Sequence, residues 1–280
     1  TRAAAASEQG FNLDEHNVED VIALARQLDG LPLALELVAA RVPSLGVREL
    51  SSRIGSHLAL VSRGRRTAPA RHQTLSAMLA WSYQLLSTPQ QIVLRRLSIF
   101  CGSFSLEAAL AVASDEQLGH PDVLEAVLAL ATKSLISVDA SRVPAAYRLL
   151  DTTRTFAAQK LAEAEAHGPV ARRHALEMQK ELVVADADYD AMSRMPWMAA
   201  HASQVADIRA ALDWCFSEGG DLQIGIQVMV NALPLHELGL LAEQTVRIAR
   251  ALASIRQLKP PRPALELRLD LKLTWPSLEP

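Results

Sequence analysis

The chain has 280 residues, of which 50% are hydrophobic and 4% aromatic, and its net charge is −3 at neutral pH. This length suits two or three small domains with a sizeable core. The mixed charge gives no reason to expect a nucleic-acid or anionic-membrane partner, and no apolar run reaches the ~18 residues of a membrane span. Sparse glycine and long runs of alanine, leucine and valine favour helix over sheet.

The cysteines and the amino terminus indicate a compartment. Cys101 and Cys215 lie in apolar helical surroundings, which is typical of buried free thiols in a reducing environment. The first residues lack the apolar core of a signal peptide. We therefore expect a cytoplasmic protein with no membrane partner. A start at Thr1, without methionine, suggests a piece of a longer protein.

The first 60 residues predict a small helical domain. Apolar residues at helical spacing indicate a helix over 18–28, with Asn17 as its N-cap. Gly30 ends that helix, and Pro32 opens a second one that runs to residue 41. A third short helix is expected over 47–54. Residues 61–72 hold glycine, proline and four arginines without periodicity, so they are interpreted as a linker.

Residues 73–168 predict a winged-helix domain. Four helices are expected over about 74–86, 88–98, 105–113 and 121–134. Thr88 is expected to be the N-cap of the second, and His120 could cap the fourth. The period then changes, so that 135–138 and 146–150 predict the two strands of a hairpin. Four helices followed by a hairpin is the winged-helix order, and a last helix over 152–166, ended by Gly168, closes the domain.

Residues 169–280 predict a TPR-like helical-repeat array. Helices are expected over 170–186, 199–217, 222–233 and 238–257, although no clean repeat period emerges. The alternating tail over 265–273 has the period of a strand, but its composition favours a helix. Trp214, Cys215 and Phe216 are expected in a repeat core, whereas Trp197 fits an exposed contact point and ordinary packing equally well. The predicted fold class is therefore mainly α, with a helical lid domain (1–60), a linker (61–72), a winged-helix domain with one β-hairpin (73–168) and TPR-like helical repeats (169–280).

Three stretches, in this order, resemble the region that follows the P-loop domain in STAND-type, NB-ARC-like signalling ATPases of the bacterial regulator type. The first is 28–41, which contains the turn Gly30-Leu31-Pro32. The second combines Arg71-His72-Gln73-Thr74-Leu75 with Trp81-Ser82-Tyr83, Leu86-Ser87 and the segment 94–100. The third is 147–154, which resembles the wing strand and the exit helix. The resemblance covers about half of the chain.

The resemblance implies a nucleotide-dependent switch. It implies that Gly30, Leu31 and Pro32 contribute to a cofactor site, with Pro32 close to the base of ATP or ADP held by an upstream P-loop domain. Family members of the plant and animal type carry a Met-His-Asp triplet whose histidine reaches the diphosphate. Here Leu149, Leu150 and Asp151 stand at those positions, so phosphate sensing from Leu150 is not expected. Taken alone, the Gly30–Pro32 turn would be a simple helix–helix joint.

The chain lacks the sequence signatures of catalysis. It has no Gly-x-x-x-x-Gly-Lys-Ser/Thr loop to cradle phosphates and no Gly-x-Ser-x-Gly elbow. Its eight histidines show no metal-ligand spacing with cysteines or carboxylates. We therefore expect no enzyme activity, no metal and incomplete binding of ATP or ADP by this part of the parent protein.

Two functions remain open. The leading hypothesis is a regulatory segment of a STAND-type ATPase, active in bacterial signalling or transcription regulation, whose repeats bind a protein or small-molecule inducer. The alternative is a DNA-binding winged-helix transcription factor with a helical dimerisation domain. We expect no DNA contact, because the would-be recognition helix over 122–134 carries two acids and only Lys133. The arginines of the linker are more typical of a solvated loop.

Overall fold

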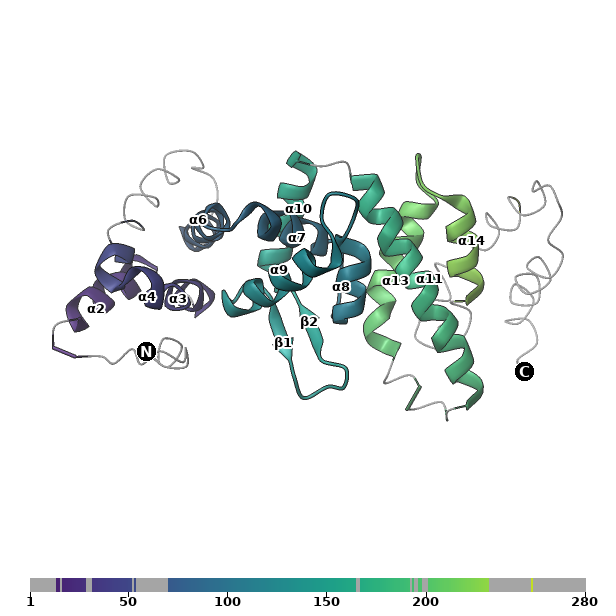
Figure 1. Ribbon diagram of the computed structural model, residues 1–280, viewed down its shortest axis with the longest axis horizontal. Coiled ribbons are helices and arrows are strands. Elements are labelled where there is room, and N and C mark those ends of the chain that lie inside the picture. Colours follow the sequence, from purple (N-terminus) through teal and green to yellow (C-terminus); the bar gives the residue numbers. More distant parts are fainter. Residues whose placement is uncertain are drawn as a thin grey trace. The chain divides into compact units, whose positions relative to one another are not determined.

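The structure is a computed structural model that describes residues 14–15, 17–28, 32–51, 53, 70–164, 167–191, 193, 196–197, 201–231 and 253. The described part is mainly helical with one two-stranded antiparallel sheet, which confirms the predicted α fold with a hairpin (Figure 1). Contacts divide the chain into two compact units, residues 1–98 with 114–160 (unit 1) and residues 99–113 with 161–280 (unit 2). The four-part domain division stays a prediction.

Unit 1 begins with short helices around a shared apolar core. They are α2 (Val18–Gln27), α3 (Pro32–Ala39), α4 (Val42–Leu45) and a helical stretch from residue 47, and they are followed by α6 (Ala70–Gln84). Asn17 does not cap α2 through its side chain, since its Oδ1 accepts the backbone N–H of Asp14 at 3.1 Å instead. The buried core residues are Leu24, Leu28, Ala34, Val38, Val47, Leu50, Met78 and Trp81, so α6 packs on the amino-terminal helices.

The next helix of unit 1, α7 (Thr88–Leu97), begins one residue from the expected cap. Ser87 has extended backbone angles and is the N-cap, so the assignment of Thr88 was wrong by one position. The Ser87 N–H donates to Gln90 Oε1 at 3.3 Å, which satisfies one amide at the helix start.

Helix α9, the hairpin and α10 follow in the chain. Helix α9 (His120–Thr132) packs on α7, and its N-cap is Gly119 rather than His120. It ends in a Schellman turn, where Ser134 adopts φ 58° and the Leu135 N–H returns to the Leu130 carbonyl at 3.0 Å. The strands are β1 (Ser137–Asp139) and β2 (Ala146–Arg148), shorter than expected, and α10 (Asp151–Ala164) follows them.

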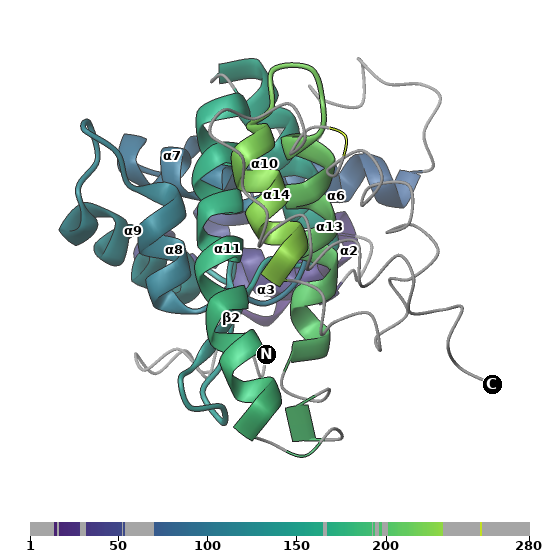
Figure 2. The same cartoon turned by 90° about the vertical axis from the view of Figure 1, so that its right-hand side faces the viewer.

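Unit 2 is built around one long helix. Helix α11 (His167–Ala191) packs against α8 (Leu106–Ala113), α13 (Val205–Cys215) and α14 (Leu222–Asn231), as Figure 2 shows for the last two. A short 3-10 turn, η1 (Ala202–Gln204), precedes α13. Gly168 lies in the first turn of α11, so it does not end the preceding helix as predicted.

Close packing in unit 2 settles the open question about Trp197. That indole is fully buried and its Nε1 donates to the Ala185 carbonyl at 2.9 Å, so it is a packing residue and not an exposed contact point. Cys215 and Phe216 are buried as expected, whereas Trp214 and Cys101 are only half-buried; both cysteines are free thiols. A Cβ on Gly225 would lie 2.8 Å from Cys215 Cβ, so α13 and α14 approach closely because position 225 has no side chain.

Some predicted features lie outside the described residues. They are most of the linker, all but one residue of the helix over 238–257, and the tail over 265–273. Among the helices that the structure does describe, none combines the length and hydropathy of a bilayer-crossing segment.

Candidate functional site

The predicted nucleotide turn is only partly visible. Gly30 and Leu31 lie outside the described residues, and Pro32 is described only as the first residue of α3. Proline at this position is compatible with a helix start, because the first N–H groups of a helix have no intrahelical partner. A nucleotide contact at Gly30, Leu31 and Pro32 therefore stays a prediction.

Helix α3 leads to a buried cation that sequence reasoning missed. Arg41 is only 6% exposed, and its guanidinium carbon lies 5.9 Å from the centre of the Trp81 ring on α6. Arg41 Nη2 reaches the Ser82 carbonyl at 3.5 Å, the outer limit of a hydrogen bond, while Nη1 is buried without an acceptor. Burial holds the pKa of Arg41 below its ordinary value.

A second cation, Lys133, lies near the first. Lys133 is the C-cap residue of α9, and its Nζ donates to Gln90 Oε1 at 2.6 Å. Partial burial lowers the pKa of the Lys133 ammonium, and the positive charge of Arg41 lowers it further. Neither cation forms an ion pair with an acidic residue in the part of the chain that the structure describes. Two helical segments distant in sequence thus place like charges near each other.

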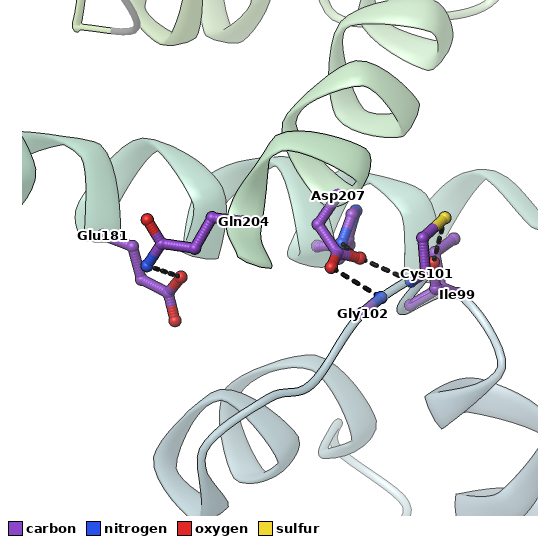
Figure 3. A network of polar contacts seen from close by, with 7 residues as sticks. Ile99, Cys101, Gly102, Glu181, Gln204 and Asp207 are labelled. Carbon is purple, nitrogen blue, oxygen red and sulfur yellow. Dashed lines mark hydrogen bonds and ion pairs between the residues drawn. The ribbon is translucent and has the colours of Figure 1, made fainter. Parts of the chain in front are cut away.

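Unit 2 contains a buried carboxylate that is fully hydrogen bonded. Asp207, on the first turn of α13, accepts the N–H of Cys101 at 2.6 Å and that of Gly102 at 3.0 Å (Figure 3). His174 Nε2 on α11 lies 3.2 Å from Asp207 Oδ1, and Asp207 and His174 are 2% and 1% exposed. A Cβ on Gly102 would lie 2.7 Å from the Ser203 carbonyl, so the short loop approaches the 3-10 turn η1 closely because residue 102 is glycine.

A second carboxylate in unit 2 titrates near neutrality. Burial raises the pKa of Glu181 to about 7, and the negative charges of Glu177 and Asp207 raise it further. Lys180 and a hydrogen bond from Gln204 Nε2, at 3.1 Å, oppose this shift (Figure 3). Gln204 also contacts His201 Nδ1 at 3.1 Å through its Oε1, so the amide bridges an imidazole and a carboxyl group.

The outward face of α9 is acidic and apolar rather than basic. Asp122 and Glu125 are exposed, and Leu124 and Leu128 are 37% and 50% exposed. On the hairpin, the Arg142 and Arg148 guanidinium groups lie 3.7 Å and 3.8 Å from the carboxylates of Asp139 and Asp151. This surface offers few uncompensated positive charges to a phosphate backbone.

Leu149, Leu150 and Asp151, which the sequence resemblance matched to a Met-His-Asp triplet, include no histidine. Leu149 is buried, whereas Leu150 is 41% exposed. An aliphatic group at Leu150 cannot donate a hydrogen bond to a phosphate. Among the described residues there is also no group of three or more metal-ligating side chains.

Comparisons with known proteins relate the chain to mycobacterial regulators. Over 231 residues it is 33% identical to a protein of Mycobacterium tuberculosis named "Putative HTH-type transcriptional regulator", a match that covers 81% of this chain and 26% of that protein. A Mycobacterium bovis protein with the same description matches equally well. An uncharacterized M. tuberculosis protein is 37% identical over 164 residues, which are 58% of this chain and 42% of that protein.

Two further comparisons found no relative. No protein-family model matches the chain. No solved structure matches it significantly. The chain spans about a quarter of the length of the named regulators, and it is similar to a segment of proteins described as transcriptional regulators.

Proposed function

We propose that this chain is a non-catalytic regulatory segment of a bacterial STAND-type ATPase that controls transcription. The observation that carries the proposal is the order of its elements: the short helices α2, α3 and α4, then helices with one hairpin, then a helical unit around α11. The same order is expected from the resemblance of the sequence to STAND-type ATPases. The names of the mycobacterial relatives support a role in regulation.

The proposed mechanism is conformational. An upstream P-loop domain holds ATP or ADP, and Pro32 contacts the base. The nucleotide state then biases how this segment packs, while a protein or small-molecule inducer binds the helical repeats of unit 2. Such coupling needs only a ligand that binds two arrangements with different affinity. No covalent chemistry is assigned to the residues of this segment.

Nucleotide binding by the longer parent protein tests the proposal. The dissociation constants of ATP and ADP are measured for the parent with its native sequence and with Pro32→Ala. We expect weaker binding of both nucleotides by the variant, because a contact to the base is common to them. Pro43→Ala, on α4 outside the predicted turn, is the matched control. Unchanged affinity in Pro32→Ala would remove this residue from the site.

The alternative is a DNA-binding winged helix, which the term "HTH-type" in the names of the relatives favours. The chain covers 26% of that relative, so the name does not assign a helix-turn-helix to this segment. The exposed acids and leucines on α9 favour the regulatory segment instead. A gel-shift titration of this chain at several salt concentrations separates the two functions, since tight and steeply salt-dependent binding would support the alternative.

A further inference from the structure

Arg41 differs from another arginine with the same burial in unit 1. Arg96 is also 6% exposed, but its Nη2 forms an ion pair with Asp115. Although burial would raise the pKa of Asp115, hydrogen bonding from Arg96 lowers it below the ordinary value. Arg41 has the Trp81 ring and one carbonyl at 3.5 Å, and no acid among the described residues pairs with it. The fold compensates one buried guanidinium and leaves the other without a counter-charge.

The side chain of Ser82, beside Arg41, also lacks a hydrogen-bond partner. Ser82 is fully buried, and its Oγ has no hydrogen-bond partner in the described structure. Its carbonyl is the group that Arg41 Nη2 contacts, so the hydroxyl and the guanidinium belong to one neighbourhood. Lys133 carries a second positive charge that acts on Arg41, and its ammonium donates to the neutral amide of Gln90. Two buried donor groups from separate elements, the Arg41 guanidinium and the Ser82 hydroxyl, therefore lie in one neighbourhood, and no acid among the described residues pairs with the guanidinium.

Such an arrangement is electrostatically incomplete. A buried charge without a partner is costly, and so is a buried donor without an acceptor. A small oxyanion would accept from Arg41 Nη1 and Ser82 Oγ and would neutralise the repulsion between Arg41 and Lys133. Arginine suits this task because its planar fork of donors matches two oxygens of one phosphate, and lysine adds a point charge that favours a dianion over a monoanion.

We propose that Arg41, Ser82 and Lys133 form a binding site for a phosphate group. The ligand is inorganic phosphate or the phosphate of a nucleotide, which present the same oxygens to these donors. The site uses no residue of the Gly30–Pro32 turn and needs no upstream domain. It can therefore be tested on this chain alone, and its failure is distinguishable from failure of the proposed ATPase role.

The test is thermal unfolding of the 280-residue chain with increasing sodium phosphate, at constant pH and at an ionic strength balanced with sodium chloride. A ligand that binds only the folded state raises Tm by mass action, and we expect a saturable rise of about 3 °C. Arg41→Met should abolish the rise, and Lys133→Gln should shift the titration to higher phosphate concentrations. Arg48→Met is the control, because Arg48 is highly exposed and should leave the response intact.

Fluorescence gives a second readout that does not depend on the stability of a variant. Because the Arg41 guanidinium lies over the Trp81 ring, phosphate binding should change the emission of that indole. The chain has four tryptophans, so the change is assigned by its loss in Trp81→Phe. A signal that persists in Trp81→Phe, or a Tm rise of equal size in Arg41→Met and the native chain, would refute the site.

Parallel titrations identify the source of the phosphate. ATP and ADP that act at lower concentration than inorganic phosphate, with the same dependence on Arg41, indicate a nucleotide ligand. Inorganic phosphate that acts alone indicates free phosphate. An equal response to sodium acetate would overturn the assignment to phosphate and indicate a carboxylate from a protein partner instead.

Discussion

The two units handle a buried charge in opposite ways. In unit 2, Asp207 accepts two backbone amides and contacts His174, so its charge is matched by hydrogen bonds. In unit 1, the guanidinium of Arg41 has an orphaned Nη1, and no acid among the described residues pairs with it. The first arrangement fixes the loop at 101–102 on α13. The arrangement around Arg41 leaves a positive charge that a bound anion can neutralise, which is typical of a binding site rather than of a purely structural contact.

The largest loss of stability is expected when Asp207 is replaced. Asp207→Ala would leave the amides of Cys101 and Gly102 and the imidazole of His174 without their acceptor. We expect a loss of about 3–5 kcal/mol in the free energy of unfolding, measured by urea denaturation. Glu218→Ala, in the exposed turn after α13, should change it by less than about 0.5 kcal/mol. A small loss at Asp207 would show that the network does not hold unit 2 together.

The free energy of unfolding should depend on pH because of Glu181. Its pKa is raised from 4.5 to about 7, so the folded state binds this proton more tightly than the unfolded chain. The contribution of Glu181 to the free energy of unfolding is then fully present below pH 4.5. That contribution, about 2–3 kcal/mol, is lost as the pH rises toward 7. Glu181→Gln should flatten the stability profile in this window. An unchanged profile would show that Glu181 ionises normally in the fold.

An intermediate effect is expected at Gly102. Gly102→Ala would place a methyl group 2.7 Å from a backbone carbonyl and 3.1 Å from Asp207 Oδ2, which the loop can relieve only by moving. We expect a loss of about 2 kcal/mol in the free energy of unfolding. Gly168→Ala is the matched control, since nothing lies within 4 Å of its Cβ and alanine favours a helix. Equal effects at both glycines would contradict the close approach.

The smallest change in the free energy of unfolding should come from Arg41→Met, without the large loss expected for Asp207→Ala. Without added anion, Arg41→Met removes an uncompensated buried charge while it keeps much of the side-chain volume. We expect the free energy of unfolding to stay within about 1 kcal/mol of the native value or to rise. Arg96→Met should instead be clearly destabilising, because it leaves Asp115 unpaired. A large loss in Arg41→Met would show that Arg41 is structural.

Sequence periodicity predicted the helices better than their ends. The spans of α2, α7, α8 and α14 lie within a few residues of the predicted ones, since apolar spacing is a local property. The ends depend on contacts that periodicity does not contain. Ser134 ends α9 with a positive φ that glycine would normally signal, and Gly168 lies inside a helix although glycine usually stops one.

The candidate sites also differ in how far their residues could be recognised from local sequence. The sequence could single out the turn Gly30-Leu31-Pro32 because it is a short continuous motif. The nucleotide contact of this turn stays a prediction. Asp207 was not recognisable, because an acid in the first turn of a helix is ordinary and its amide donors lie 106 and 105 residues away. Arg41 gave no signal either, because an arginine at the end of a helix is normally exposed.

By itself, the sequence determined the mainly helical class, the hairpin, the free thiols and the resemblance to a regulatory ATPase segment. These follow from composition, period and local motifs, which act over a few residues. Only the tertiary structure decided that Trp197 is buried, that Asp207 holds the loop at 101–102, and that neither Arg41 nor Lys133 pairs with an acid among the described residues. The cost of a buried charge depends on what surrounds it in space, and those surroundings come from segments far apart in the chain.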